Sequence, residues 1–299
     1  MKIRVKVPAS SANLGPGFDV FGLAIDLYNE FIVEEANMFE IKTNGANSLP
    51  KTKDNLFYQS FAYLFQRLDR KIPKVKITMN IQIPLGRGFG SSATAVVGGL
   101  MAANIYLKNK YAKDDLLPFA VGLERGRHPD NVTPALMGGL IIVTANNGKV
   151  TYVKLPFPKN LKAIYFVPEF AMDTAATRKL MPKIYPKEDV VFNTSRVALL
   201  LAALQTGKHH LLRIAMEDKI HQPTRTKIFP LMPQIIDTAL TAGAYGAALS
   251  GGGSSIIAIA DKDFDQIAKK MSNRAKLKGL AGKTYILEVN NKGTEVFSE

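Results

Sequence analysis

The first 70 residues change from an alternating pattern of hydrophobic and polar positions to a helical one. Short stretches with the spacing of β-structure predict four strands, at Ile3–Val7, Val20–Leu27, Glu30–Glu35 and Phe39–Thr43. Apolar residues then recur at helical spacing from Leu56, and Asp54 is placed to act as the N-cap of that helix. The chain is therefore expected to begin with strands and to continue into a helix.

The middle of the chain switches between strand and helix patterns. Strands are predicted at Lys74–Ile83 and Gly139–Thr144, and helices at Ser91–Leu107 and Lys113–Leu123. The first of these helices is built from small apolar residues, which indicates a buried helix. It is too short, and too often interrupted by glycine, to span a membrane.

The stretch Gly148–Asn160, with one glycine and two prolines, is the expected domain boundary. Beyond it, strands are predicted at Ala163–Pro168, Ala247–Leu249, Ser254–Ala260 and Tyr285–Asn290, and helices at Asp189–Leu204, His209–Glu217, Pro233–Thr241 and Asp263–Met271. Strands and helices mix without a regular β-α-β repeat, which favours α+β domains over a doubly wound sheet. We expect two domains, over residues 1–152 and 153–299.

Composition narrows the class of protein. The 299 residues are 46% hydrophobic and 21% charged, as in soluble globular proteins. The absence of cysteine excludes disulfides, thiolate zinc sites and a cysteine nucleophile, and the four histidines are too scattered to suggest a metal site. The N-terminus, MKIRVKVPAS, is typical of a strand and not of a signal peptide. We expect a cytoplasmic protein.

The formal net charge is +14, from 39 Lys and Arg against 25 Asp and Glu. Basic residues are spread along the chain, and the densest group, between Lys269 and Lys278, follows a predicted helix whose solvated face it would form. A basic surface, or a field that attracts anionic substrates, is favoured over nucleic-acid binding, because no zinc-finger, basic-zipper or aromatic RNA-binding pattern occurs. Neither nucleic acid nor a membrane is an expected partner.

A glycine-rich segment, P-L-G-R-G-F-G-S-S-A-T-A from Pro84 to Ala95, joins a predicted strand to a predicted helix. Such a loop offers free backbone N–H groups at the positive end of a helix dipole, which is an anion-binding arrangement. Glycines at positions 86, 88 and 90 permit positive φ and a close approach to phosphate. The segment matches neither G-x-x-x-x-G-K-[ST] nor G-x-G-x-x-G. Its single cation, Arg87, is expected to face solvent.

Two other segments share this small and polar character. One is P-A-S-S-A-N-L-G-P-G-F-D-V-F-G, from Pro8 to Gly22, and the other is A-A-L-S-G-G-G-S-S-I-I-A, from Ala247 to Ala258. Each alone is weak, because glycine-rich hairpins are common. The three in one chain, in this order, are a specific combination.

The three segments together resemble the GHMP kinases, an ATP-dependent family of small-molecule kinases. P-x-G-x-G-x-G-S-S-A is similar to the family's ATP loop, and H-P-D-N-V-T-P-A-L-M-G-G (His128–Gly139) to its middle motif. The resemblance runs from residue 1 to about residue 260. It implies an N-terminal domain like ribosomal protein S5 domain 2, a ferredoxin-like C-terminal domain and an active site between them. It also implies transfer of phosphate from ATP to L-homoserine, with Mg²⁺, by a homodimer.

The resemblance also assigns the ATP and metal sites. The ATP-binding residues it implies are Pro84, Leu85, Gly86, Arg87, Gly88, Phe89, Gly90, Ser91, Ser92, Ala93, Thr94 and Asn55. Ser92 and Glu124 are the expected Mg²⁺ ligands, although relatives place this glutamate at varying distances before the histidine of the middle motif. A solvent-facing charge is the alternative for Glu124.

An acceptor with a carboxylate, an ammonium and a hydroxyl needs cations, an anion and a polar aligning group. The substrate-binding residues implied are Asn13, Asp19, His128, Asn131, Thr174, Arg178, Arg225 and Gly252. The two arginines are candidates for the carboxylate and Asp19 for the ammonium. Surface salt bridges are the alternative for the arginines, and a capping or core histidine for His128.

The catalytic set implied is Asn131, Ser92 and Glu124. Asp19 and Asp130 are the carboxylates available as a general base, but we favour direct attack by a hydroxyl that Asn131 aligns, since phosphoryl transfer relies on positioning and charge neutralisation. The open alternatives are another GHMP kinase, of mevalonate or diphosphocytidyl-methylerythritol type, and a non-catalytic member that senses metabolites or binds nucleic acid.

Overall fold

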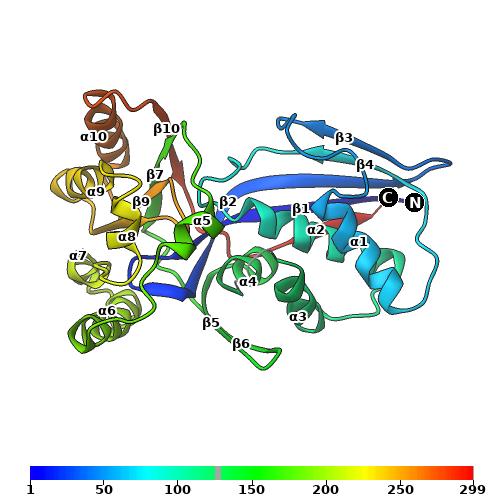
Figure 1. The fold of residues 1–299 in the computed structure, drawn as a ribbon, viewed down its shortest axis with the longest axis horizontal. Coiled ribbons are helices and arrows are strands. Elements are labelled where there is room, and N and C mark those ends of the chain that lie inside the picture. Colours follow the sequence, from blue (N-terminus) through cyan, green and yellow to red (C-terminus); the bar gives the residue numbers. More distant parts are fainter. Residues whose placement is uncertain (125–128, 299) are drawn as a thin grey trace.

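The computed structural model describes residues 1–124 and 129–298, which form two β-sheets with helices packed against them (Figure 1). The larger sheet has the strand order β11-β1-β2-β4-β3, with β5 on β2 and β6 on β5. Its strands are β1 (Lys2–Asn13), β2 (Gly17–Glu35), β3 (Glu40–Asn44), β4 (Val75–Asn80), β5 (Leu140–Asn146), β6 (Lys149–Leu155) and β11 (Glu295–Ser298). None of the helices in the described part of the chain could cross a membrane.

The long antiparallel hairpin of β1 and β2 is the centre of the larger sheet. Ile3, Val5 and Val7 are buried, as their alternation predicts. The two strands predicted at Val20–Leu27 and Glu30–Glu35 are one continuous strand, β2. The polar residue at the predicted break, Asn29, is buried and hydrogen-bonds the backbone of the segment after β4, so the strand continues through it.

Four helices cover one face of the larger sheet (Figure 1). They are α1 (Leu56–Arg67), α2 (Ser91–Tyr106), α3 (Lys113–Leu123) and α4 (Pro129–Met137). The buried helix expected after the glycine loop is α2, whose small residues let it pack closely on α1. The prediction that Asp54 caps α1 is wrong: Asn55 is the N-cap, because its side chain accepts from the backbone N–H of Phe57 at 3.0 Å.

The smaller sheet has the order β10-β7-β9-β8. Its strands are β7 (Lys162–Pro168), β8 (Gly246–Leu249), β9 (Ile256–Ala260) and β10 (Gly282–Leu287). The accompanying helices are α5 (Thr174–Lys179), α6 (Lys187–Thr206), the 3₁₀ turn η1 (His209–Leu211), α7 (Leu212–Ala215), α8 (Gln222–Thr226), α9 (Met232–Thr241) and α10 (Phe264–Lys276). α9 and α10 pack on one face of this sheet, α10 against β7 and α9 against β8 and β9, and Ile164 and Phe166 of β7 belong to the core they form.

The other face of the smaller sheet joins the two halves of the molecule. Tyr165 of β7 lies in one hydrophobic cluster with Leu14 and Phe21 from the β1–β2 hairpin and with Leu200 of α6. The hairpin therefore reaches from the larger sheet into the core of the second half (Figure 1). The segments that flank its turn are held between the two halves.

The expected division after residue 152 does not follow the sheets. It falls inside β6, which belongs to the larger sheet, and β11 returns to that sheet beside β1, with Ile3 opposite Ser298. β11 is a short strand whose partner lies nearly the whole chain away, so no local pattern marks it.

Candidate active site

The three glycine-rich segments singled out in the sequence meet at one place between the sheets. The backbone N–H of Gly251 donates to the carbonyl of Ala12 at 3.0 Å, and Asn13 Nδ2 donates to the carbonyl of Gly251 at the same distance. Ser250 Oγ donates to the carbonyl of Gly88 at 2.6 Å. The first and third segments thus hold each other and also position the glycine loop.

The glycine loop has the backbone that its composition predicts. Gly86, Gly88 and Gly90 all have positive φ, between 64° and 78°. A Cβ on Gly88 would overlap with the carbonyl oxygen of Ser250. α2 begins directly after Gly90 with no side-chain cap, so its first N–H groups are presented to the loop. This backbone geometry is suited to an anion.

Asn29 holds both ends of this loop, and sequence analysis missed it. Its Oδ1 accepts from the N–H groups of Gln82 and Ile83, at 3.0 and 3.1 Å, just before the loop. Its Nδ2 donates to Thr94 Oγ1 at 2.8 Å, just after the loop. The residue sits under the loop and ties its entry to its exit. No pattern in β2 distinguishes this asparagine from a surface one.

The prediction that Arg87 faces solvent is wrong. Its Nε donates to the carbonyl of Pro168 at 2.7 Å, and its Nη2 donates to the carbonyl of Glu169. Both acceptors lie at the end of β7. Arg87 therefore fastens the glycine loop to the smaller sheet, and Phe89 does so beside it by packing on Tyr165, with 4.6 Å between ring centroids.

The first turn of α2 carries an oxygen pair. Ser92 Oγ donates to Glu124 Oε1 at 2.5 Å, and Glu124 is buried at the C-cap of α3. The two residues are 32 positions apart in the sequence, and the packing of α3 beside α2 brings them together. The alternative that Glu124 is a solvent-facing charge is excluded.

α4 places two polar residues against the glycine loop. Asn131 Oδ1 accepts from Ser10 Oγ at 3.0 Å, and a Cβ built on Gly90 would lie 3.0 Å from the same oxygen. Asp130 is buried, and Asn131 Nδ2 donates to it at 3.3 Å. Burial raises the pKa of Asp130 to about 7, and the nearby charge of Asp19 adds to the rise.

Arg178 of α5 and Asp19 of β2 form an ion pair, with Arg178 Nη2 2.5 Å from Asp19 Oδ1. Asp19 has a positive φ of 60°, and its N–H donates to Asn13 Oδ1 at 3.1 Å, which fixes its direction. The guanidinium of Arg178 lies over the ring of Phe18, 4.7 Å from its centroid. A cation and an anion thus stand side by side.

A second guanidinium approaches the same ring. Arg225 is buried, with its central carbon 5.6 Å from the centroid of Phe18, and its Nη1 donates to the carbonyl of Gly251 at 3.2 Å. Burial and the like charge of Arg178 lower the pKa of Arg225 to about 10, so it still carries its charge at neutral pH. The alternative of a surface salt bridge is excluded for this residue.

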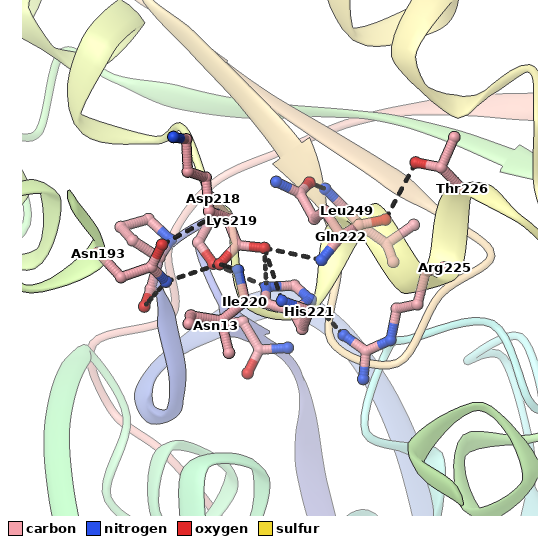
Figure 2. A network of polar contacts seen from close by, with 12 residues as sticks. Asn13, Asn193, Asp218, Lys219, Ile220, His221, Gln222, Arg225, Thr226 and Leu249 are labelled. Atoms are coloured by element: carbon pink, nitrogen blue, oxygen red, sulfur yellow. Dashed lines mark hydrogen bonds and ion pairs between the residues drawn. The ribbon is translucent and has the colours of Figure 1, made fainter. Parts of the chain in front are cut away.

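A buried polar network around His221 and Asp218 contacts Arg225 (Figure 2). His221 contacts both Arg225 and the carbonyl of Gly15. The fully buried carboxylate of Asp218 accepts from the N–H groups of His221 and Gln222, at 3.0 and 2.7 Å, at the start of α8. The sequence carries one signal for His221, its spacing four residues before Arg225 in H-Q-P-T-R, but no helix is predicted over this segment.

The remaining predicted site residues are placed as follows. Gly252 faces Thr174, since a Cβ on the glycine would lie 2.6 Å from Thr174 Oγ1. Asn55 is buried, and its amide is used to cap α1 and to donate to the carbonyl of Pro50 at 2.7 Å, so its contact with ATP stays a prediction. His128 lies outside the described residues.

The arrangement combines a glycine loop at a helix start, a partly buried hydroxyl–carboxylate pair, and two arginines beside an aspartate. The loop suits a nucleotide phosphate, and the charged group suits a small zwitterion. With two joined α+β halves, these features define the class of small-molecule phosphotransferases.

Comparison with known proteins identifies the family. The chain matches the GHMP kinases N terminal domain over residues 55–139 and the GHMP kinases C terminal domain over residues 200–277. Homoserine kinase of Persephonella marina is 39% identical over 98% of both chains. That of Carboxydothermus hydrogenoformans is 43% identical over 86% of this chain and 84% of its own. The chain belongs to the GHMP kinase family.

Solved structures agree with this assignment. The crystal structure of homoserine kinase from Cytophaga hutchinsonii has a TM-score of 0.90 at 31% identity, over 99% of this chain and 97% of that chain. Methanococcus jannaschii mevalonate kinase shares the fold, with a TM-score of 0.72 at 18% identity over 96% and 98% of the two chains. The expected two-domain α+β GHMP kinase architecture is confirmed.

Proposed function

We propose that this protein is a homoserine kinase of threonine biosynthesis, which transfers the γ-phosphoryl group of ATP to the hydroxyl of L-homoserine. The observation that carries the substrate is the pair of guanidinium groups, Arg178 and Arg225, on the ring of Phe18 beside the carboxylate of Asp19. An amino-acid acceptor offers a carboxylate to the former and an ammonium to the latter. The homoserine kinases that match nearly the whole chain support this choice.

In this proposal the glycine loop holds the β- and γ-phosphates of ATP. The N–H groups from Gly86 to Ser92 supply hydrogen bonds, and the uncapped start of α2 supplies a favourable dipole. Arg87 and Phe89 act through the loop, since their side chains are used to anchor it to the smaller sheet. Pro84, Leu85, Ala93 and Thr94 complete the loop and the first turn.

Ser92 and Glu124 fit Mg²⁺, because both present hard oxygens and lie 2.5 Å apart at the start of α2. Among residues 1–124 and 129–298, no group of three or more His, Cys, Asp or Glu side chains is placed to hold a metal. One carboxylate and one hydroxyl suit an ion that takes its other ligands from water and phosphate. Bound there, Mg²⁺ supplies charge neutralisation of the transferring phosphoryl group.

Asn131 aligns the acceptor hydroxyl in this proposal, since it lies beside both Gly90 and Ser10. The hydroxyl oxygen forms a bond to the γ-phosphorus as the bond from that phosphorus to the β–γ bridging oxygen breaks. ADP is the leaving group, and the hydroxyl proton is released to water. Thr174, Gly252, Asn13 and His128 are assigned to the rest of the acceptor site. If Asn131→Ala kept near-normal kcat while Asp130→Ala abolished it, Asp130 would be a base and the roles would be reversed.

A panel of acceptors in a coupled assay of ADP release tests the function. We expect Mg²⁺-dependent turnover with L-homoserine and none with mevalonate or diphosphocytidyl-methylerythritol, which carry no ammonium for Asp19. Turnover with mevalonate alone would overturn the substrate. Salt-dependent DNA binding without ATP turnover would support a non-catalytic protein instead.

We further propose a cytoplasmic homodimer. Light scattering after size exclusion should give twice the 32.7 kDa of one chain. A mass of one chain at micromolar concentration would exclude the dimer, and recovery in a membrane or secreted fraction would exclude the location.

A further inference from the structure

His221 lies between the turn of the β1–β2 hairpin and Arg225, and its two ring nitrogens have different partners (Figure 2). Nε2 lies 2.7 Å from the carbonyl oxygen of Gly15. A carbonyl can only accept, so Nε2 carries the hydrogen. Nδ1 contacts Arg225 Nη1, and a guanidinium can only donate, so Nδ1 has a free lone pair. Both neighbours require the same neutral tautomer.

The surroundings of the ring keep it neutral. The side chain is fully buried, and Phe18 stacks on it with 5.3 Å between ring centroids. Burial lowers the pKa of His221 to about 4, and Arg225 acts in the same direction. Asp218, whose Oδ2 lies 3.6 Å from Nε2, and Asp19 oppose this change without reversing it.

The histidine decides which edge of Arg225 is available. Nη1 of Arg225 is used by two acceptors, His221 Nδ1 and the carbonyl of Gly251. Nε of Arg225 is buried and makes no hydrogen bond within the described residues. A guanidinium binds a carboxylate through two adjacent nitrogens, and the commitment of Nη1 leaves the edge formed by Nε and Nη2.

We propose that His221 is a positioning residue, which accepts a hydrogen bond from Arg225 through Nδ1 and so presents the Nε–Nη2 edge to the carboxylate of the acceptor. The proposal rests on the proposed function, because the carboxylate belongs to that acceptor. His221 does not touch the substrate. Its effect is on acceptor binding and leaves ATP binding unchanged.

Two conservative variants separate this role from a purely structural one. His221→Asn places an amide oxygen near the position of Nδ1, so it keeps an acceptor for Arg225 and loses the bond to Gly15. His221→Gln places its amide nitrogen near the position of Nε2, so it keeps the bond to Gly15 and loses the acceptor. Both remove the stacked ring and so serve as controls for each other.

Steady-state kinetics with L-homoserine distinguish the outcomes. We expect His221→Gln to raise KM for homoserine about tenfold, and His221→Asn to raise it no more than about threefold, as the loss of one charge-assisted hydrogen bond predicts. KM for ATP stays within about threefold in both variants. Combining His221→Gln with Arg225→Lys should add little to the effect of Arg225→Lys alone. Equal defects in the two single variants, or a parallel rise in KM for ATP, would overturn the proposal.

A spectroscopic test is independent of the acceptor. Long-range ¹H–¹⁵N spectra of histidine-labelled protein contain signals from four histidines, and His221→Asn identifies one of them. We expect a neutral ring with the hydrogen on Nε2 from pH 6 to pH 8. A hydrogen on Nδ1, or an imidazolium in this range, contradicts the proposal even if homoserine is a substrate. Absence of homoserine turnover in the wild-type protein would instead refute the proposed function and leave the tautomer result standing.

Discussion

Replacement of Asn29 by alanine should weaken ATP binding without touching the nucleotide site. The side chain lies beneath the glycine loop and hydrogen-bonds the residues on both sides of it. Alanine removes the acceptor of the Gln82 and Ile83 N–H groups and the donor to Thr94. The loop then has to be ordered when ATP binds.

The loss of stability in Asn29→Ala follows from the three hydrogen bonds that the side chain makes. The N–H of Ile83 is buried, and leaving such a group without an acceptor costs about 1–3 kcal/mol. The bonds to Gln82 and Thr94 are partly replaceable by water or by other acceptors, at about 0.5–1 kcal/mol each. We expect the free energy of unfolding to fall by about 2–5 kcal/mol. If ordering the loop costs about a third to a half of this free energy when ATP binds, ATP binds about tenfold more weakly.

Asn104 provides the matched control. It is a buried asparagine near the other end of α2, where its amide bonds both the N–H and the carbonyl of Tyr111, at 3.0 and 2.9 Å. Asn104→Ala should therefore lose similar stability and keep the wild-type affinity for ATP. Chemical denaturation measures the first quantity, and calorimetric titration with a non-hydrolysable ATP analogue measures the second.

The two variants must differ for the reasoning to stand. If Asn29→Ala lost stability but bound the nucleotide as tightly as the wild type, the hydrogen bonds would support the fold and not the loop. If both variants bound it equally weakly, the effect would be global destabilisation.

Three further predictions concern the same site. Burial raises the pKa of Asp130 from 3.8 to about 7. The free energy that the neutral carboxyl contributes to the stability of the protein is therefore fully present below about pH 4 and is lost as the pH rises through 7. Relative to Asp130→Asn, the wild type should lose about 4 kcal/mol between pH 4 and pH 8 in denaturant titrations, and a constant difference would contradict the buried carboxyl. Ser92→Ala should raise the Mg²⁺ concentration for half-maximal rate about tenfold, and the control Ser195→Ala, on the exposed side of α6, should leave it unchanged. An unchanged Mg²⁺ dependence in Ser92→Ala would show that Ser92 is not a metal ligand. Gly88→Ala should lower kcat/KM for ATP by about 10- to 100-fold, because φ is +78° and the Cβ meets the carbonyl of Ser250. Gly148→Ala, with φ +77° in open space, is its control, and equal activity losses would point to backbone strain alone.

The glycine-rich loops could be predicted from the sequence because their chemistry is local. Glycine at alternate positions between a strand and a helix predicts positive φ and an exposed helix start, and both occur in Gly86–Gly90 and α2. The hydrophobic spacing of the strands and of α1 and α2 was likewise read from neighbouring residues. The substrate residues came from resemblance to a family, and their roles remain predictions.

The residues that sequence analysis misplaced are polar groups whose partners are distant. Asn29 interrupted a predicted strand, Arg87 was expected in solvent, and His221 was not assigned a role. The hydrogen bonds that define these roles join residues 53 or more positions apart in the sequence. The contact between His221 and Arg225 is the exception. A polar side chain in a sequence is ordinarily expected at the surface, and only its partners show that it is buried and satisfied.

The sequence alone determined the glycine-rich loop, the α+β class and the family, because backbone conformation, hydrophobic periodicity and motifs depend on adjacent residues. The tertiary structure decided which side chains complete the site. It brought Ser92 to Glu124 and Asp19 to Arg178, and it placed His221 behind Arg225. These pairings depend on the packing of α3 on α2 and of the β1–β2 hairpin into the second half. Burial makes each of these polar contacts stronger than it would be in water, and makes its loss more costly.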